Sequence, residues 1–189
     1  MPKITQISPL LEPNFIKPIA ITYEIQGTIK KWEAVISHDA VSILLYNSTR
    51  DSFVLVKQFR VPILNANKKD GYTYELCAGI IDKEISNKEI AREEVLEECG
   101  YDIPLGSITK VTSYYTSVGI SGASQTLYYA EINDSMIINE GGGLPEENIE
   151  VIYLSLKDAK EFMFNESYQK TPGLIMAFYW FFDTKMKTI

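Results

Sequence analysis

The segment from residue 79 to residue 101, GIIDKEISNKEIAREEVLEECGY, constrains the fold of this chain more than any other segment. Ser86 and Glu89 have the spacing of a capping box, in which each side chain bonds the backbone of the other residue and fixes the start of a helix. Gly100 follows Cys99 at the place where a helix commonly ends in a left-handed residue. The segment therefore predicts a glycine, a loop, and a helix that begins after Ser86 and ends before Gly100.

The second half of this helix is crowded with acidic side chains. At about 100° per residue, Glu94, Glu97 and Glu98 fall on one patch, opposite the apolar side that carries Ala91 and Val95. Like charges four positions apart destabilise a helix by about 0.2–0.5 kcal/mol per pair, and this end of a helix already carries negative partial charge. A solvated acidic surface is the ordinary alternative, but it would favour Lys or Arg here. The cluster instead predicts a site for Mg²⁺ or Mn²⁺, which prefer oxygen ligands.

Composition and charge exclude several classes of protein. With 189 residues, 46% of them hydrophobic, the chain can bury one sizeable core. No apolar run approaches the roughly 20 residues of a membrane span, and the first residues do not have the pattern of a signal peptide. The net charge of −7 disfavours nucleic acid as a partner. Two cysteines indicate reduced thiols in a cytoplasmic protein, and a lone histidine, His38, excludes a multi-histidine zinc site.

β-prone segments dominate the chain, with a few helices placed late. A capping-box pattern predicts one helix at Ser155 and Asp158, and Thr171 with Pro172 begins a final helix that is apolar nearly all round. Gly27 with Thr28 is a plausible hairpin turn, and the glycine-rich segment 139–148 is a loop. The pattern predicts an α+β layered domain. The predicted strands are 19–26, 32–36, 40–47, 52–59, 71–79, 107–115, 124–132 and 149–155.

Residues 79–101 resemble the box that defines the Nudix hydrolases: a glycine, five residues, a glutamate, seven residues, and then REUxEExGU, where U is bulky and apolar. Ile85 stands in place of the first glutamate and Glu93 in place of the arginine. Glu84 and Arg92 keep the same separation one place earlier, so the loop-to-helix salt bridge of the family is expected to have shifted there. Alternatively, packing of Ile85 on Ile90 replaces it. The positions in register are Gly79, Glu94, Val95, Glu97, Glu98, Gly100 and Tyr101.

The flanking segments HDAVSILLYNSTRDSFVLVKQFR, YELCAGIIDK, SVGISGASQTLYYAE and GGGLPEE resemble the UDP-sugar diphosphatase branch, which is close to the ADP-ribose pyrophosphatases. The resemblance implies a Nudix-type α/β/α sandwich of mixed β-sheet over residues 37–189. It also implies an N-terminal β-strand arm over residues 1–36 that contacts a second copy in a homodimer. The implied activity is Mg²⁺-dependent hydrolysis of UDP-glucose to UMP and glucose 1-phosphate, with Mn²⁺ as a possible substitute for Mg²⁺.

The resemblance also assigns roles to the residues of the box. Carried over position by position, Glu94, Glu98 and the carbonyl of Ala78 are metal ligands. Glu97 is a further ligand or holds a metal-bound water, and Glu97 and Glu98 count as catalytic. Divalent ions suit this chemistry because they neutralise a diphosphate that would otherwise repel an attacking hydroxide.

A general base is expected in the loop after the glycine-rich turn, as in the ADP-ribose relatives. Glu146 and Glu147 are the first candidates and Glu150 is the third; the alternative is an acidic loop exposed to solvent. For the substrate, Arg60 suits bidentate binding of a phosphate, although a structural ion pair is nearly as plausible. The residues predicted to contact substrate are Lys57, Arg60, Glu75, Ser117, Ser121 and Gln125.

Three other functions are open at this point. The first is an ADP-ribose or ADP-sugar pyrophosphatase of the same family. The second is a catalytically silent Nudix-fold binding module, which Ile85 and Glu93 make conceivable and which the retained glutamates oppose. The third is a serine hydrolase around GISGA, which departs from the G-x-S-x-G elbow at Ala123 and leaves His38 as the only base.

Overall fold

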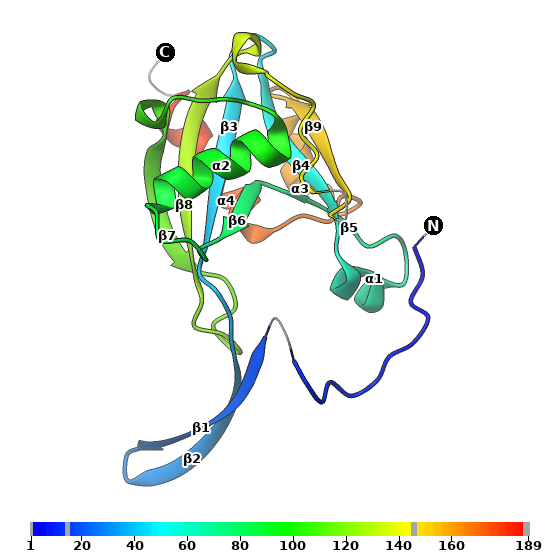
Figure 1. Ribbon diagram of the computed structural model, residues 1–189, viewed down its shortest axis with the longest axis vertical. Helices are drawn as coiled ribbons and strands as arrows, with labels where there is room; N and C mark the ends of the chain where they lie inside the picture. The colour runs from blue at the N-terminus through cyan, green and yellow to red at the C-terminus, as the bar shows by residue number, and fades with distance from the viewer. Residues whose placement is uncertain (1, 14–15, 145–146, 187–189) are drawn as a thin grey trace.

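The computed structural model describes residues 2–13, 16–144 and 147–186. Over these ranges the main body is one mixed sheet with helices on both faces, and a two-stranded hairpin projects from one end of it (Figure 1). This α/β/α arrangement confirms the predicted α+β class. None of the helices in the described ranges is both long and apolar enough to cross a bilayer.

The main sheet is built from seven strands of the described chain. They are β3 (Ala40–Asn47), β4 (Ser52–Phe59), β5 (Tyr72–Glu75), β6 (Cys77–Ile80), β7 (Thr109–Tyr115), β8 (Ser124–Ile132) and β9 (Ile149–Ser155). The order is β5-β4-β3-β8-β7, with β6 added to β3 and β9 added to β4. The β3–β8 pair is parallel, and the other pairs are antiparallel. The sheet is therefore mixed, as predicted.

Strands β3 and β4 separate toward one end of the sheet. They pair only over residues 45–47 and 52–54; beyond that point β5 pairs with β4, and β6 pairs with β3. The single strand predicted over 71–79 is therefore wrong, because the chain crosses from β4 to β3 at Leu76 and breaks there. This crossing places Glu75 and Ala78 where the sheet opens.

Four α-helices accompany the sheet in the described residues: α1 (Val61–Asn67), α2 (Asn87–Cys99), α3 (Ala159–Phe164) and α4 (Pro172–Thr184). Figure 1 shows α2 in front of the sheet, with α3 and α4 behind it. Alternate residues of β3 serve the two cores: Ile43 packs toward α2, and Leu44 packs toward α4. On the α4 face, the rings of Phe53 and Phe178 stack with centroids 4.4 Å apart. The final helix, apolar nearly all round, therefore buries one side in the domain on this face.

Two helix predictions need correction. Helix α1 was not predicted; Pro62 lies in its first turn, a position with which proline is compatible. Helix α3 begins at Ala159 rather than after Ser155, because Ser155 hydrogen-bonds Asp158 within a separate turn. The predicted capping box at Ser155 is therefore wrong.

The N-terminal hairpin consists of β1 (Lys17–Ile25) and β2 (Thr28–Ile36), which pair only with each other. Its turn is at Gln26 and Gly27, whose φ angles of 51° and 74° are left-handed, so the predicted turn was one residue late. The base of the hairpin contacts the main body through the loop before β8. There the Val35 N–H bonds the Ile120 carbonyl at 2.7 Å, and the Trp32 indole bonds the Gly119 carbonyl at 2.9 Å.

Candidate active site

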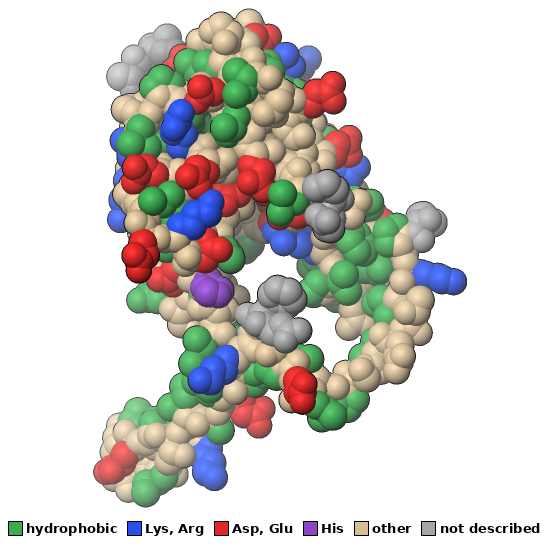
Figure 2. Space-filling view, in the orientation of Figure 1, with side chains coloured by type: hydrophobic (Ala, Val, Ile, Leu, Met, Phe, Trp, Pro, Cys, Tyr) green, Lys and Arg blue, Asp and Glu red, His purple; other side chains and the backbone are tan. Residues whose placement is uncertain are grey.

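Helix α2 has the ends that the sequence predicted. Ser86 and Glu89 form both bonds of the capping box, and Gly100 closes the helix with a φ of 77°. The last turn contains no basic residue. Figure 2 shows acidic side chains in a band across the face that α2 occupies in Figure 1. The helix thus presents acidic side chains where its own backbone is negative.

The three glutamates of α2 differ in their environments. Glu98 is buried and accepts a hydrogen bond from the Ala78 N–H at 3.0 Å; burial raises its pKa to about 8. Glu94 is half-buried, and burial together with the charge of Glu97 raises its pKa to about 7. Glu97 is exposed. The three glutamates predicted to share one patch therefore range from buried to exposed, because Glu98 turns beneath the helix toward β6.

Gly79 allows β6 to pass close to Glu94. A Cβ atom at this position would lie 2.0 Å from Glu94 Oε1, which no side chain could accommodate without moving the carboxylate. The neighbouring Ala78 directs its N–H to Glu98, away from β3. In an antiparallel ladder the N–H and C=O of one residue lie on the same edge of the strand, so the Ala78 carbonyl also faces this edge. Both predicted features of the site, the box glycine and the Ala78 carbonyl, thus meet at the carboxylates.

This donor set fits a divalent cation. Burial raises the pKa values of the two carboxyl groups to about 7 and about 8, and a bound cation would favour their ionised form in place of the protons. Carboxylate and carbonyl oxygens are the ligands that Mg²⁺ prefers. Within the described ranges, no group of three or more acidic, histidine or cysteine side chains is already assembled around one point. Glu94, Glu98 and the Ala78 carbonyl are therefore the core of the candidate metal site, with Glu97 beside it.

The glycine-rich loop packs against the end of α2. The Gly142 N–H bonds the Glu98 carbonyl at 2.8 Å, and the Gly143 N–H bonds the Glu97 carbonyl at 3.1 Å. These bonds satisfy two of the carbonyls that a helix end leaves free. The same contact holds the start of the 144–150 segment near the acidic residues.

Of the described candidates for a general base, Glu147 is the one whose charge acts on Glu94 and Glu98. Its negative charge contributes to the raised pKa of both Glu94 and Glu98, and its carboxylate accepts the Leu144 N–H at 2.8 Å. Glu150, on β9, forms an ion pair with Lys57 at 3.0 Å. Glu146 lies outside the described residues.

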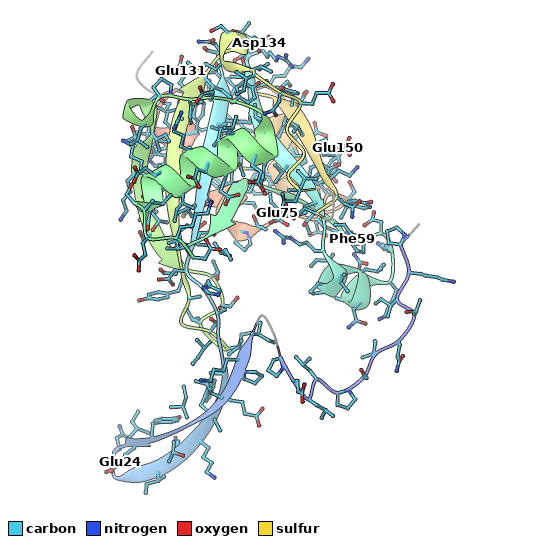
Figure 3. All side chains as sticks on the ribbon, in the orientation of Figure 1. Glu24, Phe59, Glu75, Glu131, Asp134 and Glu150 are labelled. Carbon is cyan, nitrogen blue, oxygen red and sulfur yellow. The ribbon has the colours of Figure 1, made fainter. Side chains whose placement is uncertain are left out.

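The cations predicted to bind phosphate are both engaged in ion pairs. Arg60 bonds Glu75 through Nε and Nη2, each at 2.8 Å, which is the structural pairing considered above. The charges of Glu98 and Glu147 contribute to raising the pKa of Arg60, so its guanidinium remains close to the acidic site. Figure 3 shows Glu75 and Glu150 on the same side of the body, far from Glu131 and Asp134 at its other end.

A cavity of about 280 Å³ adjoins the carboxylates on the α4 face of the sheet. Four of the residues predicted for the site line it: Glu75, Ala78, Ser117 and Gln125. The sequence analysis missed Ser42, Tyr114 and the first turn of α4, which complete its wall. The alternation of β3 could have indicated Ser42, since it is the polar residue on the same face as Leu44. Nothing local in the sequence brings α4 to this place.

Ser121 lies outside this cavity. Its hydroxyl is 3.1 Å from the Ser37 hydroxyl and accepts the Ala123 N–H, so it fastens the loop to the base of the hairpin. It lines a more open hollow together with His38. No hydrogen bond joins Ser121 to His38 in the described part of the chain, which removes the geometric basis for the serine hydrolase alternative.

A different ion pair compensates for the two departures from the box, Ile85 and Glu93. Glu93 bonds Lys83 of the preceding loop at 2.5 Å, so loop and helix are still fastened, with the signs of the charges reversed. Arg92 bonds Asp102 at 2.7 Å and the Ile103 carbonyl at 2.8 Å. The predicted shift of the salt bridge to Glu84 and Arg92 is therefore wrong.

Comparison with known proteins agrees with this geometry. The NUDIX domain profile matches residues 36–172, which is most of the chain. Uridine diphosphate glucose pyrophosphatase NUDT14 of Bos taurus is 39% identical over an alignment that covers 89% of each chain, and the Mus musculus protein of the same name is 38% identical. GDP-mannose pyrophosphatase of Salmonella arizonae is 35% identical over 80% of this chain and 81% of its own. The chain belongs to the Nudix family.

Proposed function

We propose that this chain hydrolyses the diphosphate bond of a nucleotide sugar, with UDP-glucose as the leading substrate. Water adds to one phosphorus, the bridging P–O bond breaks, and UMP and glucose 1-phosphate leave. The observation that carries the proposal is a pair of carboxylates, half-buried Glu94 against Gly79 and buried Glu98 on the Ala78 N–H, beside a cavity that Ala78 also lines. The relatives named as UDP-glucose pyrophosphatases support the choice of substrate.

Nudix hydrolases generally need divalent metal ions, and we propose Mg²⁺ for this chain, with Mn²⁺ able to replace it. Glu94, Glu98 and the Ala78 carbonyl would hold the ion, and Glu97 would support it from the exposed side. Such an ion neutralises the diphosphate and activates water when bound. The residues themselves would position the substrate: Glu75 engages Nε and Nη2 of Arg60, which leaves Nη1 to donate to a phosphate.

Glu147 is the proposed proton acceptor. Its carboxylate stands near Glu94 and Glu98, whereas Glu150 is neutralised by Lys57. We expect Glu147→Gln to lower kcat about a hundredfold or more, as removal of a general base does, and Glu150→Gln to leave kcat within about threefold of wild type. Steady-state kinetics with UDP-glucose would compare the two variants. Equal losses would remove Glu147 from this role.

We also propose that the N-terminal arm, residues 1–36, joins two chains in a homodimer. An isolated two-stranded hairpin is marginal in water, and this one exposes Ile21, Ile29 and Trp32. Covering these side chains with a second copy would remove them from solvent. Light scattering should give about twice the mass of 21.4 kDa, and Trp32→Ser with Ile29→Ser should shift the protein toward the monomer.

A substrate panel tests the function as a whole. UDP-glucose, GDP-mannose, ADP-glucose and ADP-ribose would be compared with Mg²⁺ present, and phosphorus NMR in ¹⁸O-water would identify the phosphorus that receives the oxygen. We expect the highest kcat/KM with UDP-glucose. GDP-mannose is the second candidate, since a relative at 35% identity carries that name. A preference for ADP-ribose would replace the proposed substrate, and no turnover of any of them would favour a silent binding module.

A further inference from the structure

The cavity on the α4 face contains a buried hydroxyl that the protein itself does not use. Ser42 is 2% exposed and lies directly opposite Ala78 in the β3–β6 ladder. The residue lines the cavity, and its Oγ is fully buried behind that wall, with no hydrogen-bond partner of normal geometry among the described residues. Buried polar groups are normally satisfied, and leaving one unpaired costs free energy of folding. A serine kept in this state beside a cavity indicates a ligand that would satisfy it.

The neighbouring side chains do not satisfy Ser42. Burial raises the pKa of the Tyr114 hydroxyl and the nearby Ser42 hydroxyl acts to lower it, but the two do not form a hydrogen bond of normal geometry. Tyr114 donates its own proton to Gln125 Oε1 at 2.9 Å. Within the described residues, the Ser42 hydroxyl therefore keeps its hydrogen-bonding capacity, which a small shift of the cavity wall would offer to a bound molecule.

The start of α4 adds further donors to the same cavity. The helix has 13 residues, and the side chain of its N-cap, Thr171, makes no capping bond. The N–H groups of Gly173 and Leu174 precede the first intrahelical bonds and have no acceptor within the described chain. A Cβ atom at Gly173 would lie 2.3 Å from the Tyr114 hydroxyl, so the glycine lets the Tyr114 side chain pack against the first turn of α4.

Resting on the proposed function, we propose that this cavity binds the hexose of the nucleotide sugar. Ser42 and the first turn of α4 would contact its hydroxyl groups and discriminate among sugars. The cavity meets the candidate metal site at Ala78, so a diphosphate at the carboxylates would place its sugar here. The lining combines hydroxyl, amide and N–H groups with the carboxylate of Glu75, and hydroxyl-rich ligands both donate and accept bonds.

The test is Ser42→Ala, compared with Ser52→Ala as a matched control. Ser52 is also buried, at 3% exposed, and its Oγ is also without a partner in the described structure. It is the first residue of β4 and lies outside the cavity. Both variants remove an unpaired hydroxyl, so both should melt at or above the wild-type temperature. Only Ser42→Ala should lower kcat/KM for UDP-glucose, by about fivefold, as loss of one hydrogen bond predicts.

A second substrate separates the hexose from the phosphates. The methyl ester of UDP keeps both phosphates and carries a methyl group in place of the sugar. Ser42→Ala should hydrolyse it as wild type does. An equal loss on both substrates would assign Ser42 to the phosphates, and no loss on either would leave it without a role; each result overturns the proposal.

A binding measurement keeps the inference independent of turnover. Glucose 1-phosphate would be titrated calorimetrically into wild type, Ser42→Ala and Ser52→Ala without metal. We expect the affinity to fall about fivefold in Ser42→Ala alone. If wild type turned over no nucleotide sugar, the proposed function would fail, whereas equal affinities in all three proteins would overturn the hexose site by itself.

Discussion

The two ends of the main sheet carry two polar clusters that differ in one respect. At the end away from the hairpin, the buried Asn47 amide donates to the Tyr101 hydroxyl at 3.0 Å and to Asp134 at 2.8 Å. At the other end, neither Glu94 nor Glu98 forms an ion pair with any basic side chain in the described part of the chain. The hydrogen bonds from Asn47 and Arg50 lower the pKa of Asp134, whereas burial raises those of Glu94 and Glu98.

Polar groups in the interior of this protein are thus of two kinds, those that stabilise the fold and those that are suited to bind a ligand. A cluster in which each group has a partner holds the fold, because its hydrogen bonds are complete without any ligand. A cluster of like charges that are buried lowers the free energy of unfolding until something binds. The second arrangement persists in a folded protein because the rest of the core supports it.

The largest expected effect comes from neutralising Glu98. Glu98→Gln keeps the size of the side chain and an oxygen for the Ala78 N–H, but removes the charge. We expect kcat/KM for UDP-glucose to fall about a hundredfold or more, since charge stabilisation at a reacting diphosphate is lost. Without metal, the melting temperature should stay equal or rise.

Asp134→Asn, at the other end, is the matched control. It should lower the melting temperature and leave kcat/KM unchanged, because Asp134 anchors Asn47 and Arg50. If Glu98→Gln kept wild-type turnover, the metal assignment would be wrong.

A smaller loss of activity is expected from Gly79→Ala. The added methyl group would occupy the position of the Glu94 carboxylate and displace it, so kcat/KM should fall about tenfold, as misplacement of a reacting group commonly does. Gly106→Ala is the control, because a Cβ at Gly106 would meet no atom within 4 Å. Kinetics at saturating Mg²⁺ would compare the two alanine variants. Full activity in Gly79→Ala would show that Glu94 is free to move.

At the far end, Asn47→Ala should change stability and not catalysis. The side chain donates to Tyr101 and Asp134 and accepts from the N–H groups of Thr49 and Arg50. Losing these bonds in a buried place should lower the free energy of unfolding by about 3 kcal/mol. Urea unfolding would measure this change, and kcat of the folded fraction should match wild type. A fall in kcat would mean that the two ends of the sheet are coupled.

The pH dependence of stability should also distinguish the clusters. The folded-state pKa values of Glu94 and Glu98, about 7 and about 8, lie above the ordinary value of 4.5. The folded protein therefore binds more protons than the unfolded chain in this window, and its free energy of unfolding falls as pH rises from about 5 to about 8. Thermal melts without metal should show this slope, and Glu98→Gln should flatten it.

Mg²⁺ should act on the same slope. An ion that binds the ionised carboxylates stabilises the folded state by mass action, most at about pH 8 where they release protons readily. Added Mg²⁺ should therefore raise the melting temperature more at about pH 8 than at about pH 5.5. Parallel pH curves for wild type and Glu98→Gln would contradict the assignment of the raised pKa values to this pair.

Much of this arrangement could be predicted from local sequence signals. The capping box at Ser86 and the terminal Gly100 determine helix α2, because both act through bonds within a few residues. The spacing of the glutamates predicted that they share one helix. It could not predict their burial, because Glu98 turns under α2 only where β6 passes.

Features that depend on distant contacts were missed. The break at Leu76 depends on β3 and β4 separating, and the cavity depends on α4 reaching Ser42 across the sheet. The reversed ion pair of Lys83 and Glu93 was also missed, because the family pattern pairs an acidic loop residue with a basic helix residue, which only Glu84 and Arg92 offer here.

The smallest expected effect concerns that reversed pair. Lys83 and Glu93 are both about half-exposed, so solvent screens their attraction. Either single reversal, Lys83→Glu or Glu93→Arg, should loosen the loop before α2 and lower kcat/KM only about twofold. The double variant Lys83→Glu, Glu93→Arg restores opposite charges in the polarity of the family box and should recover wild-type kcat/KM. A double-mutant cycle on kcat/KM measures this coupling, with Arg92→Ala, which releases Asp102 instead, as the control. If the double variant were no better than the singles, the pair would not fasten loop to helix, and the packing of Ile85 would be the remaining candidate for that role.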